Sequence, residues 1–106
     1  MAKKEKKISK KTNEGGKQFL EVNNFLKIIA DENRLRILVL LENGAMNVTD
    51  IHNKLNLPQN LTSHHISKLK SLELLTEKRE GTFRHYSVNT KNLKEYTRLF
   101  KELMKI

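Results

Sequence analysis

Residues 57–72 read LPQNLTSHHISKLKSL, and this stretch decides the fold of the chain. Side chains three and four positions apart share one face of a helix. One such face is mainly apolar and comprises Thr62, His65, Ile66, Leu69 and Leu72. The opposite face carries short polar side chains, namely Asn60, Ser63, His64, Ser67 and Ser71. Pro58 suits the first turn, where its missing N–H needs no partner, so the stretch predicts a helix over residues 59–72.

Three more helices are predicted upstream. The first, over residues 18–30, is indicated by apolar residues at helical spacing: Phe19, Val22, Leu26 and Ile29. Asp31 is a suitable N-cap for the second, whose nearly all-round apolar run at 35–41 predicts a central core helix ending near Gly44. Asn47 can cap the third, with Asp50 three residues on in a variant of the capping box. The buried stripe of this short helix comprises Val48, Ile51 and Leu55.

A hairpin and a last helix are predicted downstream. Residues 75–79 and 83–88 alternate like strands, and Glu80-Gly81-Thr82 forms a turn between them. The last helix, over residues 90–105, has an apolar stripe of Leu93, Tyr96, Phe100 and Leu103. The pattern predicts a mainly α fold with a small β-hairpin wing. This is a winged helix-turn-helix in the order α-α-α-α-β-β-α.

The composition narrows the classes of partner. A chain of 106 residues favours one domain, and its net charge of +9 favours a polyanion, either nucleic acid or an anionic membrane surface. The absence of cysteine excludes disulfides, thiolate metal sites and thiol redox sensing. No apolar run approaches the roughly 18–20 residues of a membrane span, and no signal peptide is evident. We therefore expect a cytoplasmic protein without a membrane partner.

Residues 1–17 form a lysine-rich arm. They hold seven lysines and two glutamates, and their apolar content is too small to offset the entropy of ordering. We expect this arm to be disordered and residues 18–106 to form the DNA-binding domain. Whether the arm touches DNA or is only a solvated tail stays open. Ile8 offers almost no membrane anchor, which disfavours a membrane-surface role.

The polar face of the helix at 59–72 points to base recognition. Short polar side chains can reach base edges, and a face without acidic residues allows close approach to phosphates. The DNA-contacting candidates on this helix are Gln59, Asn60, Leu61, Ser63, His64 and Ser67. Those on the wing are Arg79, Thr82 and Arg84. The alternatives are a polar helix without a ligand, and a winged-helix module that binds a partner protein rather than DNA.

Three segments resemble the ArsR/SmtB family of repressors. They are LKIIADENRLRIL at 26–38, LPQNLTSHHI at 57–66, and the wing pieces 79–81 (REG) and 84–86 (RHY). The resemblance implies a repressor that acts as a homodimer on a palindromic operator, with a dimer interface formed by the first and last helices. The interface candidates are Phe19, Val22, Leu26, Leu93, Tyr96, Phe100 and Leu103. These apolar stripes exceed what a thin monomer can cover, although packing on their own core is the alternative.

The family's metal sites do not carry over to this chain. Its thiolate site would fall at Asn47 and Thr49, and its last-helix site at Glu95 and Glu102, where no histidine follows. The remaining donors are His52, His64, His65 and His85. We expect no metal, no cofactor and no enzymatic activity, because no nucleophile accompanies the histidine pair. DNA binding should therefore be insensitive to zinc and to oxidants, and the effector is unknown.

Several single residues leave alternatives open. Glu73 stands where the family often has glycine, so the helix either bears a strained left-handed residue or ends differently. Leu61 either packs inside or meets a thymine methyl group outside. We expect His65 to be buried and hydrogen-bonded, and His64 to face DNA. Arg34 and Arg36 contact phosphate or pair with Glu32.

Overall fold

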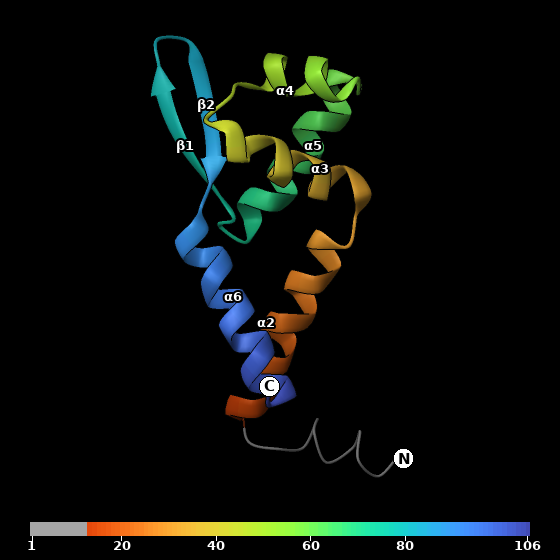
Figure 1. Cartoon of the computed structure of the whole chain (residues 1–106), viewed down its shortest axis with the longest axis vertical. Helices are drawn as coiled ribbons and strands as arrows, with labels where there is room; N and C mark the ends of the chain where they lie inside the picture. Colours follow the sequence, from red (N-terminus) through yellow and green to blue (C-terminus); the bar gives the residue numbers. More distant parts are fainter. Residues whose placement is uncertain (1–12) are drawn as a thin grey trace.

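The computed structural model describes residues 13–106 and has the predicted order of elements (Figure 1). The helices before the wing are α2 (Asn13–Ile29), α3 (Glu32–Leu40) followed by the 3-10 turn η1 (Leu41–Asn43), α4 (Val48–Leu55) and α5 (Gln59–Ser71). The wing consists of β1 (Leu75–Glu80) and β2 (Phe83–Val88), and α6 (Thr90–Met104) ends the chain. The fold is mainly α-helical with a two-stranded antiparallel hairpin, which confirms the winged helix-turn-helix.

The helices begin where the capping residues predict, except for α2. The Asp31 carboxylate accepts the backbone N–H groups of Asn33 and Arg34 at 2.9 and 3.1 Å. The Asn47 side chain accepts the N–H of Asp50 at 2.8 Å. These bonds satisfy amides that have no partner within the helix. In contrast, α2 begins at Asn13 and not at Gln18, so helix replaces the last residues of the expected arm. The rest of that arm lies outside the described residues.

The core lies where α3, α4, α5 and the wing meet. Its fully buried side chains include Ile37, Ile51, Leu69 and Leu74. The expected core helix is present, since Ile37 and Leu38 are buried, but Leu35 is 46% and Val39 is 62% exposed, so only one side of its apolar run is in the core. No element covers that side of α3 within the described part of the protomer, so an apolar run in sequence overstated its burial.

Helices α2 and α6 form a pair that projects away from this core (Figure 1). The rings of Phe25 and Tyr96 stack between them with centroids 4.7 Å apart and planes 1° from parallel. The Gln18 amide donates to the carbonyl oxygen of Leu99 at 3.3 Å. The first and last helices are therefore held together along the part of the pair that projects from the core.

The wing is joined to the strand-like residue that precedes α4. Met46 pairs with Tyr86 in an antiparallel bridge, with N···O distances of 3.0 and 2.8 Å in the two directions. The turn between the strands places Gly81 at φ +62°, a conformation that favours glycine. The bridge thus ties the middle of β2 to the segment that precedes α4.

Helix α5 ends in a left-handed residue that is not glycine. Glu73 has φ +54°, its N–H donates to Lys70 O at 2.8 Å, and Leu74 N–H donates to Leu69 O at 3.0 Å. This is the Schellman pattern, in which glycine is the favoured residue at the Glu73 position. The Asn92 side chain braces the turn by donating to Leu72 O and Glu73 O. The open question about position 73 is settled in favour of the strained residue.

We expect Glu73→Gly to raise the free energy of unfolding by roughly 1 kcal/mol, because a non-glycine residue in this region is strained by about that amount. Thermal and urea unfolding measure the change. Glu73→Ala is the matched control, since it removes the same carboxylate and keeps a Cβ atom. An equal gain in both variants would assign the effect to the charge and not to the backbone.

Candidate nucleic-acid interface

The predicted recognition face of α5 lies on the surface. Every residue proposed for it is exposed: Gln59, Asn60, Leu61, Ser63, His64 and Ser67. Leu61 is 37% exposed, so its side chain lies at the surface, and its contact with a thymine methyl group stays a prediction. Helix α5 contains no acidic residue, and Lys68 and Lys70 lie in its last turn. The face can therefore approach a polyanion without charge repulsion.

The inner face of α5 holds two buried polar side chains. Thr62 is fully buried, and its hydroxyl donates to Pro58 O at 3.0 Å. His65 is 6% exposed, which confirms its predicted burial. The predicted hydrogen bond is absent, since His65 Nδ1 has no partner among the described residues and lies 3.9 Å from Asp31 Oδ1. This distance is too long for a direct hydrogen bond.

The two wing arginines face each other across the hairpin. The strand register pairs Arg79 directly with Arg84, and it places Glu77 opposite Tyr86. Like charges in directly opposite positions destabilise a hairpin. Glu77 offsets part of this cost, because its Oε1 lies 4.0 Å from Arg84 Nη1. The remaining positive charge favours an external anion at this end of the wing.

Glu77 also ties the wing to the recognition helix. Its Oε1 accepts a hydrogen bond from Lys70 Nζ at 2.9 Å, and the same ammonium group lies 5.8 Å from the centre of the Tyr86 ring. The hydrogen bond from Lys70 is the main reason that the pKa of Glu77 lies below its ordinary value. The Lys70–Glu77 contact therefore helps to hold the wing in one position relative to helix α5.

A small cleft lies between the wing tip and the start of α4. Its volume is about 210 Å³, and its lining includes Asn47, Thr49, Thr82, Phe83 and Arg84. The structure thus brings the two wing candidates Thr82 and Arg84 beside a helix N-terminus, which attracts anions. Phe83 is 55% exposed here and was not among the sequence candidates. The sequence could have identified Phe83 as an exposed residue, because it directly follows the predicted turn, where a strand has little to pack against.

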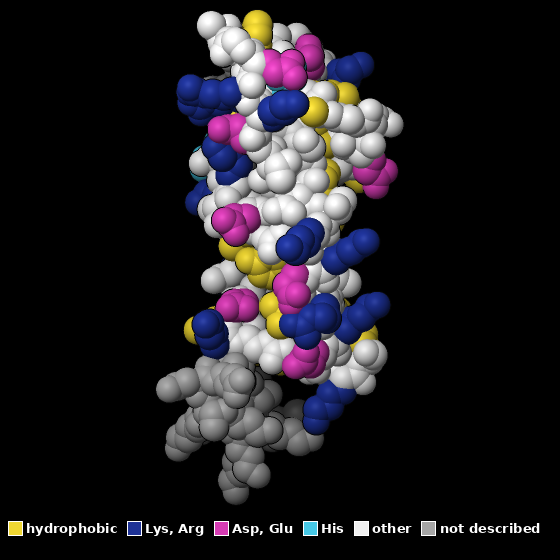
Figure 2. Space-filling view, turned by 90° about the vertical axis from the view of Figure 1, so that its left-hand side faces the viewer, with side chains coloured by type: hydrophobic (Ala, Val, Ile, Leu, Met, Phe, Trp, Pro, Cys, Tyr) yellow, Lys and Arg dark blue, Asp and Glu magenta, His cyan; other side chains and the backbone are white. Residues whose placement is uncertain are grey.

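The charges are unevenly placed on the face that carries the wing. Figure 2 shows Lys and Arg side chains gathered along one edge of the upper half, whereas in the lower half they alternate with Asp and Glu. In α6, Arg98 pairs with both Glu95 and Glu102. Helix α6 nevertheless holds four basic and two acidic side chains, so positive charge remains on α6 as well as on α5 and the wing.

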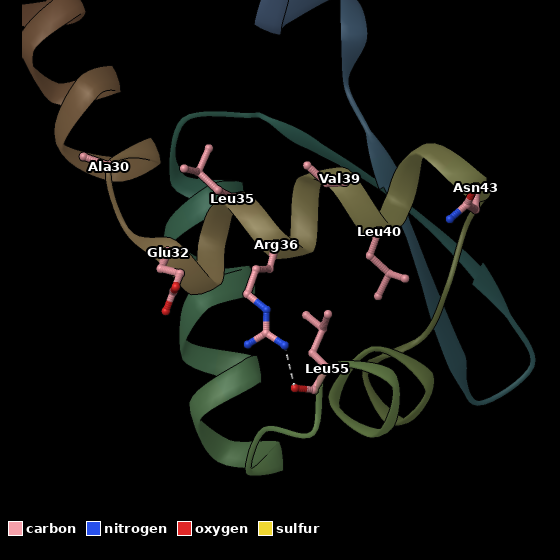
Figure 3. A pocket seen from close by; sticks show the side chains of 8 residues that line it. All are labelled: Ala30, Glu32, Leu35, Arg36, Val39, Leu40, Asn43 and Leu55. Carbon is pink, nitrogen blue, oxygen red and sulfur yellow. Dashed lines mark hydrogen bonds between the residues drawn. The ribbon is translucent and has the colours of Figure 1, made fainter.

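Arg34 and Arg36 bind backbone atoms of the protomer. Arg34 Nε donates to Ile28 O at 2.8 Å, and its Nη2 lies 3.8 Å from Asp31 Oδ2. Arg36 Nη2 donates to Leu55 O at 3.0 Å (Figure 3). Neither arginine pairs with Glu32 within the described residues, so that alternative is not found. Contact of Arg34 or Arg36 with phosphate stays a prediction.

The dimer candidates divide into exposed and internal residues. On α2, Phe19 is 43% and Leu26 is 39% exposed, whereas Val22 is only 2% exposed. Val22 therefore has almost no exposed surface in the protomer, and its part in a dimer interface stays a prediction. The candidates on α6 are half-buried: Leu93, Tyr96, Phe100 and Leu103. Tyr96 uses one ring face against Phe25 within the protomer.

A mainly apolar hollow is present on the described surface. It lies along α3, has a volume of about 700 Å³, and is bordered mainly by apolar side chains such as Leu35, Val39 and Leu40 (Figure 3). Within residues 13–106 no three His, Asp or Glu side chains lie together as a metal site. No described helix is long and apolar enough to cross a membrane.

The exposed polar helix, the basic wing and their mutual bracing define a winged helix-turn-helix transcription regulator. The family model of the bacterial regulatory proteins of the arsR family matches residues 31–77, from the cap of α3 into β1. The transcriptional repressor SdpR of Bacillus subtilis is 39% identical over 74 residues, which cover 70% of this chain and 82% of SdpR. The chain therefore belongs to the arsR family. It is a DNA-binding transcription regulator and not an enzyme.

Solved structures agree with this assignment. NolR of Sinorhizobium fredii superimposes with a TM-score of 0.73 at 27% identity, covering 87% of this chain and 92% of NolR. The winged helix-turn-helix domain of Mb0332 from Mycobacterium bovis superimposes with a TM-score of 0.72 at 24% identity, covering 84% and 83% of the two chains. The second likeness supports the fold.

Proposed function

We propose that the chain is a repressor that binds a two-fold symmetric operator as a homodimer. The observation that carries this proposal is the Arg79–Arg84 pair. The two arginines lie directly opposite each other on the wing, and the repulsion of their charges destabilises the hairpin. A DNA phosphate bound between the two guanidinium groups offsets that cost. The pair lies on the wing, which Glu77 and Lys70 brace against the recognition helix.

In this proposal α5 enters the major groove and reads base edges. Gln59 at its start and Ser63 and His64 one turn further are exposed and can reach bases. Asn60, Leu61 and Ser67 complete the contact surface. Arg79, Thr82 and Arg84 bind phosphate or the minor groove, so they contribute affinity with little sequence preference.

Two observations support the dimer. The α2–α6 pair leaves large apolar side chains uncovered in the protomer, namely Phe19, Leu20, Leu26 and Met104. The Mb0332 domain, which shares the fold, is described as a homodimer. SdpR, which shares 39% of the aligned residues, is a repressor. The proposed interface on this chain uses Phe19, Leu26, Leu93, Phe100 and Leu103.

The decisive experiment is selection of bound sequences from random duplex DNA with the purified protein at two salt concentrations. We expect enrichment of a palindrome whose half-sites lie about 34 Å apart, because a two-fold dimer places its recognition helices in successive major grooves. A half-site that binds one protomer as tightly as the full palindrome would contradict the proposal.

The wing makes a sharper prediction. We expect Arg79→Gln to weaken binding to all duplexes and to lower the salt slope by about one, because one phosphate contact is lost. The same variant should be more stable by about 0.2–1 kcal/mol, because the like-charge pair is removed. Affinity against salt concentration and urea unfolding measure the two effects.

Lys78→Gln is the matched control, since the register places Lys78 on the opposite face of the same strand. This variant removes one positive charge from the wing and leaves the Arg79–Arg84 pair in place. It should leave stability unchanged and lower affinity less than Arg79→Gln does. Equal losses in the two variants would show that only net charge matters and that the wing face is not the contact.

A further inference from the structure

A line of polar contacts runs from the terminal helices to the recognition helix. It begins at Ile28 O in α2, which accepts the hydrogen bond from Arg34 Nε at 2.8 Å. Arg34 Nη2 lies 3.8 Å from Asp31 Oδ2, and the other oxygen, Oδ1, lies 3.9 Å from His65 Nδ1. Asp31 is also the N-cap of α3. The Asp31 carboxylate therefore lies between the start of α3 and the inner face of α5, and Arg34 connects it to the end of α2.

His65 is the anomalous member of this line. Its Nδ1 is the one buried side-chain nitrogen or oxygen in the described part of the chain that lacks a hydrogen-bond partner. Buried polar groups are nearly always paired, because water that was lost must be replaced. The Asp31 carboxylate lies 3.9 Å away, so a small approach of α5 toward α3 would close the hydrogen bond. Whether the His65 imidazole is hydrogen-bonded therefore depends on the distance between α5 and Asp31 at the start of α3.

We propose that His65 is a positioning residue for DNA binding, which sets α5 against α3 through Asp31 and does so as the neutral imidazole. This inference rests on the proposed function, since the consequence is for operator affinity. In the neutral form, Nδ1–H points at the carboxylate and α5 keeps its place. A proton added to the ring puts a cation beside Arg34 and draws the carboxylate away from the amides that it caps.

The charged and titratable groups that face His65 are Asp31 and Arg34 from α3 and His64 from α5 itself. Burial is the main reason that the pKa of His65 lies below the ordinary value of 6.5; Arg34 and His64 lower it further, and Asp31 raises it. The folded protein therefore binds fewer protons than the unfolded chain. Stability from this site is present above about pH 6.5 and declines as the pH falls through the lower folded value.

The first test needs no DNA. Asp31→Asn keeps a side-chain oxygen for the N-cap and removes the charge that faces His65. NMR titration of the four histidine rings in both proteins should show the pKa of His65 falling further in the variant, because the stabilising carboxylate charge is gone. An unchanged pKa would overturn the proposal, since His65 would then not sense Asp31.

The second test measures affinity for the selected operator in the natural protein and in His65→Asn, at pH 7.5 and at a pH about one unit below the His65 pKa found in the first test. Asparagine keeps a donor near the Nδ1 position and cannot titrate. The other histidines titrate in both proteins, so the comparison isolates the part of the pH dependence that needs His65. On acidification we expect the natural protein to lose at least about fivefold more affinity than the variant.

Equal pH dependence of the two proteins would overturn the positioning role. Affinity for random duplex DNA is measured beside the operator and should show no such difference, because it depends on charge and not on helix placement. If selection yields no preferred sequence, the proposed function fails, whereas the effect of Asp31→Asn on the His65 titration is decided independently.

Discussion

Replacing Leu26 by Asp is expected to convert the proposed dimer into monomers and to lower affinity for the proposed operator by on the order of 10²–10⁴-fold. Leu26 is 39% exposed on α2, so a charge there is tolerated in the free protomer. In the dimer the same charge would be buried without a partner, at a cost that the interface cannot offset. Once the protomers separate, each half-site is bound alone and the gain from linked binding is lost.

Sedimentation velocity measures the oligomeric state, and operator titration measures the affinity. Asn24→Asp is the matched control, because it adds the same charge at an exposed position of the same helix that lies on a different face. It should stay dimeric. Tyr96 is a poorer site for this test, since its ring stacks on Phe25 within the protomer and its loss would also loosen α6. A full-strength dimer of the Leu26 variant would place the interface elsewhere.

The second large effect is expected from Gln59→Ala. Gln59 begins α5, is exposed and has no intramolecular side-chain hydrogen bond within the described residues, so its amide is free to bind a base edge. Losing a bidentate base contact costs roughly 1–3 kcal/mol on the preferred site. Discrimination should be lost at one base position, while binding to random duplexes stays nearly the same.

Competition binding against duplexes that vary one base pair at a time measures this discrimination. Ser71→Ala is the control, because Ser71 is exposed on the same helix but lies in its last turn, away from the start that enters the groove. It should leave the base preference intact. If Gln59→Ala weakened binding to preferred and random DNA equally, Gln59 would contact the DNA backbone and not a base.

Local patterns predicted much of the fold. The caps Asp31 and Asn47 accept the amides that their positions imply, because a cap depends on residues two or three positions away. The two faces of α5 follow from spacing alone, with Thr62 fully buried and His64 exposed. The wing strands follow from alternation and from the turn at Gly81.

Expectations that depended on distant neighbours were less accurate. The apolar run of α3 did not reveal that Leu35 and Val39 are uncovered, nor did helical spacing reveal that Val22 lies inside the protomer. Spacing defines which residues share a face, but it does not say which element packs on that face. The start of α2 at Asn13 likewise overrides the low helix propensity of Gly15 and Gly16.

The sequence by itself determined the order of the elements, the polar face of α5 and the absence of cysteine chemistry, because each depends on residue type and short-range spacing. Only the tertiary structure decided that Arg79 faces Arg84, that Glu77 joins the wing to α5 and that His65 lies unpaired beside Asp31. Asp31 and His65 are far apart along the chain, and they meet only because α3 and α5 pack together. Contacts of this kind depend on the combined burial of several elements, which no local pattern encodes.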